Sequence, residues 1–118
     1  MSKMFKTSTV YRPMPFQWAE DLRVKHEQAH WTLMGVKNLN EDVVDYKTRM
    51  TEGQRSFVSN NARMFTQSDV QVGRVYLECL LPLVKNNQIR GMYASAVARE
   101  YLHQEAYAAI NDTLALPI

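Results

Sequence analysis

A carboxylate, an imidazole and a phenol follow one another at helical spacing near the end of the sequence. In AREYLHQEAY, residues 98–107, Glu100 stands three residues before His103, and Tyr107 stands four residues after it. Residues three or four apart lie on the same face of a helix. Such a face offers a Glu-His pair for one metal ion, with an oxidisable phenol beside it. The alternative is a chance pairing on a solvated face, because Glu-x-x-His is common on helices.

Two expected helices carry polar residues in the middle of otherwise apolar stripes. A buried carboxylate without a partner is costly, so such a position usually has a charge partner or a metal ion. The stripe on the last helix comprises Ile89, Tyr93, Ala96, Glu100, His103, Tyr107, Ile110 and Leu114. The stripe on the preceding helix comprises Val58, Ala62, Phe65, Asp69, Val72, Tyr76 and Leu80.

Counting along the two helices places three of these polar residues at one depth. With the turn between the helices near Lys85, Asp69 lies roughly 24 Å before it at ~1.5 Å per residue. Glu100 and His103 lie roughly 22 and 27 Å after it by the same rise. Asp69 is therefore expected level with the gap between them, and helices packed ~8–10 Å apart let all three side chains meet.

Carboxylates with an imidazole suit iron or manganese better than a thiolate-type zinc site. Ferritin-like bundles hold two such ions with lone carboxylates from two helices and Glu-x-x-His from two others, so the chain carries half of that set. Asp69 as a hydrogen-bond partner of a Tyr or His is the alternative. His30 follows Glu27 in a second Glu-x-x-His, but it lies near a helix end, and we interpret it as outside the ligand set. His26 follows Arg23 and lacks the pattern.

The chain has 118 residues, 46% hydrophobic and 22% charged, which indicates one soluble globular domain or part of one. A net charge of +2 without a basic stripe argues against nucleic acid as a partner. The single cysteine, Cys79, excludes an internal disulfide and fits a reducing compartment. The N-terminus lacks a secretory signal, and the longest apolar stretch, 77–84, is too short to span a membrane. We therefore expect a cytoplasmic protein without membrane contact.

Glycine and proline are scarce, at four each, which favours an all-α fold. Residues 1–15 are expected to form an extended arm that contains two prolines. Helices are expected at about 16–33, 40–46, 51–84 and 88–114. The last two form a helical hairpin, on which the first helix packs, and such a hairpin needs further helices to cover its inner faces.

Local signals mark the ends of these helices. Thr51 and Gln54 have the spacing of a capping box at the start of the long helix. Asn40 and Asn87 are expected to cap the short helix and the last helix. Pro82 is expected to kink or end the last turn of the long helix.

Four segments stand in the order and at the spacing of one enzyme family. They are AHWTL (29–33), EDVVDYKTRMTEGQRSFVSNN (41–61), FTQSDVQVG (65–73) and AREYLHQEAYAAINDTL (98–114). From about Tyr11 to Pro117, the chain resembles the small, radical-generating subunit of class I ribonucleotide reductase. The segments are similar to its His-Trp element, its acidic helix, its first ligand aspartate and its Glu-x-x-His-x-x-x-Tyr helix.

The resemblance implies a role for each candidate residue. Asp69, Glu100 and His103 would bind one ion of a di-iron or Mn/Fe centre, with Glu100 bridging to the second ion. Tyr107 would be oxidised to a stable radical, and Trp31 would relay an electron near the metal. Without the resemblance, we would interpret Tyr107 as a core residue whose hydroxyl forms a hydrogen bond with a carboxylate. We would interpret Trp31 as an apolar residue that anchors the core.

The resemblance also implies an activity and partners. Residues 16–118 would be the N-terminal half of a ferritin-like di-metal bundle that serves in reducing ribonucleoside diphosphates to deoxyribonucleotides. The family continues with a lone Glu, a second Glu-x-x-His and a tail that docks on the large subunit. We therefore expect a split subunit, inactive until a complementary C-terminal chain and the large subunit join it in an oligomer. A cleaved or truncated product would read the same way.

Two other hypotheses remain open. A twofold dimer would offer two copies of each candidate ligand, enough for a self-complementing di-metal oxidase or metal-binding bundle. A non-catalytic helical remnant would carry the same stripes without metal. The segment TLMGVKNLN, residues 32–40, lacks the acidic residues usual in the family, which leaves the contacts of that loop open.

Overall fold

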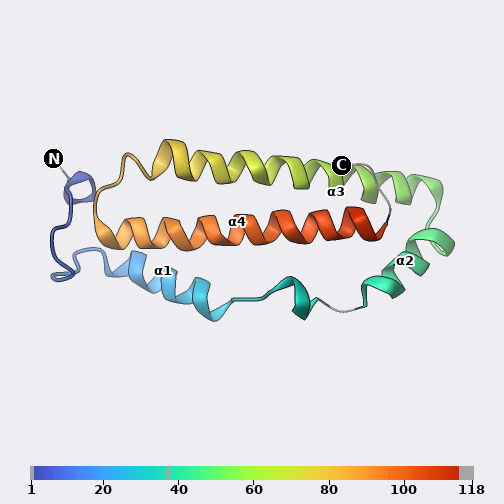
Figure 1. Ribbon diagram of the computed structural model, residues 1–118, viewed down its shortest axis with the longest axis horizontal. Helices are drawn as coiled ribbons and strands as arrows, with labels where there is room; N and C mark the ends of the chain where they lie inside the picture. Colours follow the sequence, from blue (N-terminus) through green and yellow to red (C-terminus); the bar gives the residue numbers. More distant parts are fainter. Residues whose placement is uncertain (1, 37, 115–118) are drawn as a thin grey trace. The chain divides into compact units, whose positions relative to one another are not determined.

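The computed structural model describes residues 2–36 and 38–114, and these residues form helices joined by turns and irregular segments. The described residues contain no strand, which confirms the all-α prediction. The elements are a 3₁₀ turn at Lys3–Phe5, α1 at Gln17–Gln28, a 3₁₀ turn at Leu33–Gly35, α2 at Leu39–Thr48, α3 at Glu52–Arg74, a π-helical turn at Val75–Leu80 and α4 at Asn87–Thr113 (Figure 1).

The first two helices differ from the expected ones at their ends. α1 ends at Gln28, five residues before the expected Leu33, and Thr32 is extended. The intervening His, Trp and Thr are weak helix formers, which accounts for the early end. α2 begins at Leu39 after Asn38, whose φ of 68° is left-handed, so the expected cap Asn40 lies inside the helix. Asn tolerates this conformation better than most residues.

The expected capping box is present at the start of α3. Thr51 N–H donates to Gln54 Oε1 at 2.8 Å, and Gln54 N–H donates to Thr51 Oγ1 at 3.3 Å. The α-helix ends at Arg74 rather than near Val84, and the chain continues through the π-helical turn. There Leu81 N–H donates five residues back, to Tyr76 O at 2.9 Å. Pro82, which cannot continue an α-helix, lies just after this turn, where the helical segment ends.

The cap of α4 lies one residue earlier than expected. Asn86 Oδ1 accepts from the N–H groups of Gln88 and Ile89, at 2.9 and 3.2 Å. Asn87, the expected cap, is the first residue of the helix, and its own N–H donates to Ser8 Oγ at 2.8 Å. Side-chain oxygens therefore bond to the first three N–H groups of the helix, which have no partner within it.

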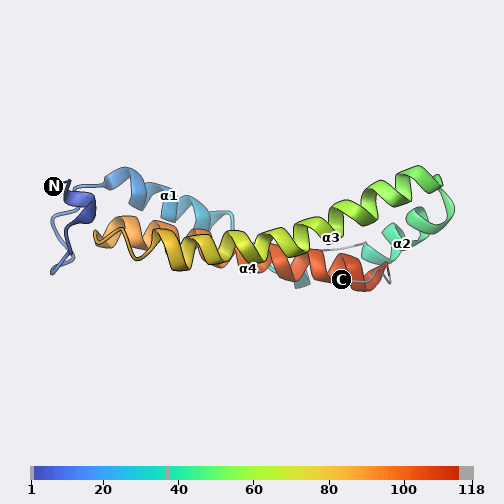
Figure 2. The same cartoon turned by 90° about the horizontal axis from the view of Figure 1, so that it is seen from above.

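The chain divides into two compact units, and the first comprises Met1–His30 and Val72–Glu100. Its apolar core is formed by Ala19, Val84 and Ile89. Within it, α1 runs beside the first turns of α4 (Figure 1 and Figure 2). Two polar contacts join these helices: Gln88 Oε1 accepts from Phe16 N–H at 2.8 Å, and His26 Nδ1 lies 2.5 Å from Ser95 Oγ.

The second unit comprises Trp31–Gln71 and Tyr101–Ile118. In it, most of α3 runs antiparallel to the second half of α4 (Figure 1). Thr66 and Asn111 form a buried hydrogen bond between the two helices, with Asn111 Nδ2 donating to Thr66 Oγ1 at 2.7 Å. α2 is held to α3 by the hydroxyls of Tyr46 and Ser59, 2.6 Å apart.

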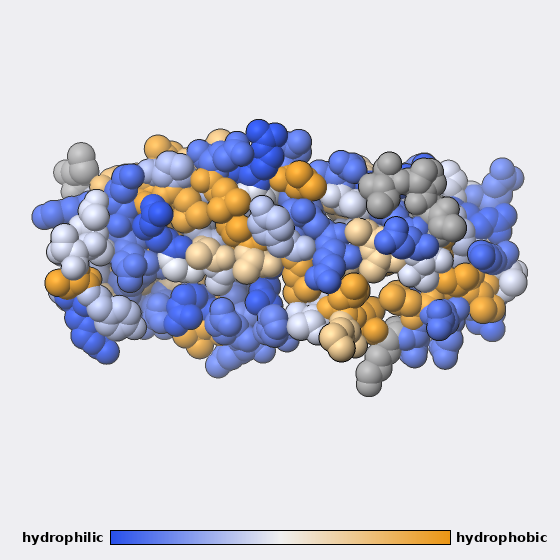
Figure 3. Space-filling model, viewed as in Figure 1, coloured by the Kyte–Doolittle hydropathy of each residue, from blue (hydrophilic) through white to orange (hydrophobic). Residues whose placement is uncertain are grey.

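The expected inner stripes face inward for the most part. On α4, the stripe residues are all buried or half-buried, and Ile89 and Leu114 are buried. On α3, Ala62 is buried, whereas Phe65 remains 40% exposed. Apolar side chains also reach the surface on the face that Figure 3 shows. No helix among the described residues is long and apolar enough to cross a membrane.

Candidate metal centre

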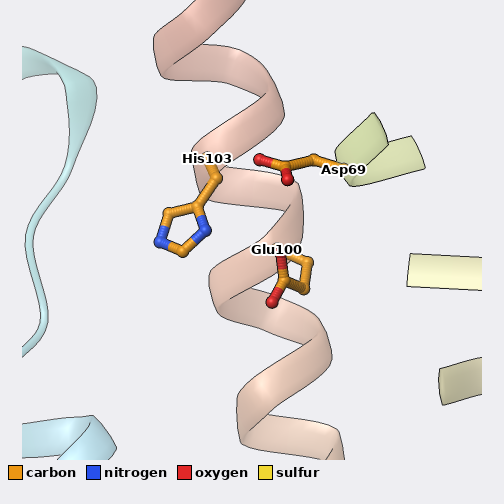
Figure 4. Close-up of side chains that lie close together, drawn as sticks. All are labelled: Asp69, Glu100 and His103. Carbon is orange, nitrogen blue, oxygen red and sulfur yellow. The ribbon is translucent and has the colours of Figure 1, made fainter. Parts of the chain in front are cut away.

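Asp69, Glu100 and His103 bring their side chains to one point. Each offers one ligand atom, and these atoms all lie within 4.8 Å of one another. All three side chains are half-buried. Figure 4 shows Glu100 and His103 on successive turns of α4, with the carboxylate of Asp69 reaching toward them from α3. The structure thus brings together the three residues that the depth count grouped.

Local helix geometry accounts for the positions of the three side chains. Glu100 and His103 are three residues apart on one continuous helix, so they project from the same face. Asp69 lies on the expected inner stripe of α3, between Phe65 and Val72, which are 40% and 38% exposed. Its main-chain carbonyl accepts a hydrogen bond from Gln104 Nε2 on α4, at 3.0 Å.

The surroundings of Asp69 fit a cation. Its Oδ2 atom is buried and has no hydrogen-bond partner among the described residues. An ionised oxygen in such a place needs a positive charge to offset its lost hydration. Two carboxylates and an imidazole form a donor set that suits iron or manganese. These three residues leave further coordination positions for donors from elsewhere.

Trp31 lies against the candidate ligand His103. The two rings stack with their centroids 6.3 Å apart and an angle of 20° between their planes. Trp31 stands in the irregular segment between α1 and the turn at Leu33–Gly35, and it is 37% exposed. Because α1 ends at Gln28, Trp31 is not part of that helix, and its indole contacts α4 instead.

Tyr107 lies one helical turn beyond His103 on α4 and is half-buried. Its ring stacks on Phe65 of α3, with the centroids 5.4 Å apart and an angle of 20° between the planes. An aromatic partner of this kind covers one face of the phenol with apolar surface.

The other histidines do not join this cluster. Residues 26–30, HEQAH, also have the H-E-x-x-H order of a zinc-binding helix. α1 ends at Gln28, however, so that segment is not one continuous helix. His26 instead contacts Ser95, and His30 is exposed. Within the described residues, Asp69, Glu100 and His103 form the only group of three potential metal ligands.

The bond from Gln104 to the main chain of Asp69 was not foreseen from the sequence. Glutamine next to a histidine on a half-buried helix carries no pattern that predicts its partner. Only the packing of α4 on α3 selects the carbonyl that it reaches.

Comparison with known proteins places the chain among small chains of one reductase. Residues 8–117 match the family model described as "Ribonucleotide reductase, small chain". A probable ribonucleoside-diphosphate reductase small subunit of Invertebrate iridescent virus 6 is 33% identical over 97% of this chain and 31% of its own length. A protein of the same description from Invertebrate iridescent virus 3 is 33% identical over 98% of this chain and 30% of its own length.

A cellular relative shows the same relation. The ribonucleoside-diphosphate reductase small chain 1 of Saccharomyces cerevisiae is 27% identical over 92% of this chain and 27% of its own length. The chain thus spans about a third of the length of these relatives.

Proposed function

This chain belongs to the ribonucleotide reductase small-chain family, and from that premise we propose that it forms part of the radical-generating subunit of a ribonucleoside-diphosphate reductase. The observation that carries the proposal is the convergence of Asp69, Glu100 and His103, with an unpartnered oxygen on Asp69. Small chains of this family generally bind a di-metal centre, and these three residues would hold one of the two ions.

Each side chain has a defined task in this proposal. The two carboxylates and the imidazole would hold a di-iron or Mn/Fe centre, and Glu100 would serve both of its ions. When bound, such a centre would supply the oxidising chemistry. Tyr107 would be the phenol that is oxidised, and the ring of Phe65 would shield one face of it from water. Trp31, stacked on His103, would be the residue that relays an electron to this site.

Asp69, Glu100 and His103 supply only part of the ligands that a di-metal centre needs. Three donors do not satisfy two ions, because iron and manganese take more ligands than these residues offer. We propose that a complementary polypeptide brings the other carboxylates and histidine, and that the completed subunit acts on ribonucleotides together with the large subunit.

Metal binding tests the first part of this proposal. Titration of the chain with Mn(II), followed by electron paramagnetic resonance of the free ion, should show binding that Asp69→Asn and His103→Gln weaken. Asp112→Asn and His30→Gln are matched controls, because both residues are exposed and lie outside the cluster. Equal binding by all four variants would remove these residues from the metal site.

The radical is tested in the assembly with the complementary polypeptide and the large subunit. After addition of Fe(II) and oxygen, the resonance signal of a tyrosyl radical should appear and should be lost in Tyr107→Phe. Tyr101→Phe is the control, because Tyr101 lies on the same helix but is 55% exposed. A signal that survives Tyr107→Phe would assign the radical to another residue.

A further inference from the structure

Gln104 links the two helices of the candidate metal centre. It follows His103 directly on α4, and its Nε2 donates to the main-chain carbonyl of Asp69 on α3 at 3.0 Å. Both residues belong to the second unit, and the contact is partly buried. The bond therefore links the main chain of Asp69, a candidate ligand on α3, to the residue that follows His103, a candidate ligand on α4.

The acceptor of this bond is a main-chain atom, which determines what the bond can control. A carbonyl oxygen has two lone pairs, so Asp69 O can accept from Gln104 in addition to its bond within α3. A bond to the side chain of Asp69 would compete with a metal ion for the carboxylate. A bond to its main chain instead sets the height of Asp69 along α4 and leaves the carboxylate available for the ion.

A second amide side chain on α4 also fixes the position of α4 along α3. Asn111, seven residues after Gln104, is fully buried and donates to Thr66 Oγ1 at 2.7 Å. Thr66 Oγ1 in turn donates to Ala62 O, also at 2.7 Å. Apolar contacts tolerate sliding, whereas a buried polar pair is satisfied in one register only. The two amides, two helical turns apart, therefore specify one register of α4 on α3.

We propose that Gln104 is a positioning residue of the metal centre, which holds Asp69 level with His103 through the main chain of α3. The inference rests on the proposed metal-binding function and extends it to a residue outside the ligand set. Removing the donor should let α3 and α4 shift, so that the carboxylate no longer meets the other ligands at one point. Groups that orient metal ligands typically contribute ~10-fold or more to metal affinity.

Two substitutions test this role in the 118-residue chain. Gln104→Met keeps the length of the side chain and removes the donor, whereas Gln104→Glu keeps its shape and turns a donor into an acceptor. Both should weaken Mn(II) binding about 10-fold. Gln67→Met is the matched control, because Gln67 is an exposed residue of α3, and this variant should bind Mn(II) as the wild type does.

The register of α4 on α3 can also be measured in the metal-free chain by nuclear magnetic resonance. Nuclear Overhauser contacts between the stacked rings of Phe65 and Tyr107 should be present in the metal-free wild type and in Gln67→Met. They should weaken or be replaced by other contacts in both Gln104 variants. Circular dichroism and the unfolding midpoint show whether each variant is folded.

The outcomes separate this inference from the proposed function. Unchanged ring contacts and unchanged Mn(II) affinity in folded Gln104 variants would overturn it. A lower unfolding midpoint with unchanged affinity would assign Gln104 a merely structural role and overturn it as well. Absence of Mn(II) binding in the wild type would instead mean that Asp69, Glu100 and His103 do not hold an ion by themselves, and the ring contacts alone would then decide whether Gln104 sets the register.

Discussion

At the scale of single residues, Asp69 shows how a site can oppose stability. Its Oδ2 is buried without a hydrogen-bond partner among the described residues, in a half-buried stripe that is otherwise mostly apolar. Such an oxygen loses hydration on folding and gains nothing in return until a cation arrives. The residue that best serves metal binding is therefore a cost to the metal-free chain.

Replacing this carboxylate by an apolar side chain should reverse that cost. We expect Asp69→Leu to raise the free energy of unfolding of the metal-free chain by about 1 kcal/mol, measured by urea denaturation. The same variant should lose Mn(II) binding. Asp112→Leu, at an exposed position of α4, should change stability little. A less stable Asp69→Leu would mean that the carboxylate has a stabilising partner in solution.

The pair of Glu20 and Arg23 makes stability depend on pH. Arg23 donates two hydrogen bonds to Glu20, at 3.1 and 2.6 Å, and this guanidinium lowers the pKa of the Glu20 carboxyl below its ordinary value. The folded state therefore binds fewer protons than the unfolded state. The stabilisation is complete above the ordinary pKa of roughly 4.5 and is lost as pH falls through the folded value.

Glu20→Gln should accordingly destabilise the chain at pH 7 and make no difference at low pH. Denaturation curves of both proteins between pH 7 and pH 3 give this difference directly. Because the pair is near the surface, 1 M salt should reduce the effect at pH 7. A difference that stays constant across this range would mean that the substitution acts through packing.

At the scale of elements, caps decide where the helices begin. The capping box at Thr51 and Gln54 was predictable, because both partners lie within one turn and need no tertiary contact. The choice between Asn86 and Asn87 at α4 was not, because both are good cap residues. Ser8 of the N-terminal segment bonds to the N–H of Asn87, and this contact between distant residues favours the earlier cap.

The two asparagines should therefore respond differently to substitution. Asn86→Ala should lower the free energy of unfolding by about 1 kcal/mol, because two N–H groups of α4 lose their acceptor. Asn87→Ala should cost much less, since no cap bond depends on its side chain. Thermal unfolding of both variants measures the contrast. Equal losses would contradict the assignment of Asn86 as the cap.

At the scale of the whole molecule, the described surface carries many large apolar side chains. Phe57 and Met64, both on α3, are 71% and 54% exposed. They are seven residues apart on one helix and so share a face, and an exposed apolar face often marks an interface with a partner. This observation supports the proposed complementary polypeptide.

Substitution of exposed and buried apolar residues should have opposite consequences. Phe57→Ser should reduce binding of a hydrophobic dye and concentration-dependent association in sedimentation, with little change in the unfolding midpoint. Ile89→Ala, in the core of the first unit, should instead destabilise the chain by about 2–5 kcal/mol. Strong destabilisation by Phe57→Ser would show that this ring is packed in solution.

The sequence by itself determined the helical class, the inner stripes and the grouping of Asp69 with Glu100 and His103. These features follow from a fixed rise and period, which a helix has wherever it lies. Only the tertiary structure decided that Trp31 stacks on His103, that Gln104 holds the main chain of Asp69 and that α3 passes into a π-helical turn. The first two contacts join residues far apart in sequence, so side-chain packing selects them. The π-helical turn departs from the α-helical period, so a count based on that period does not predict it.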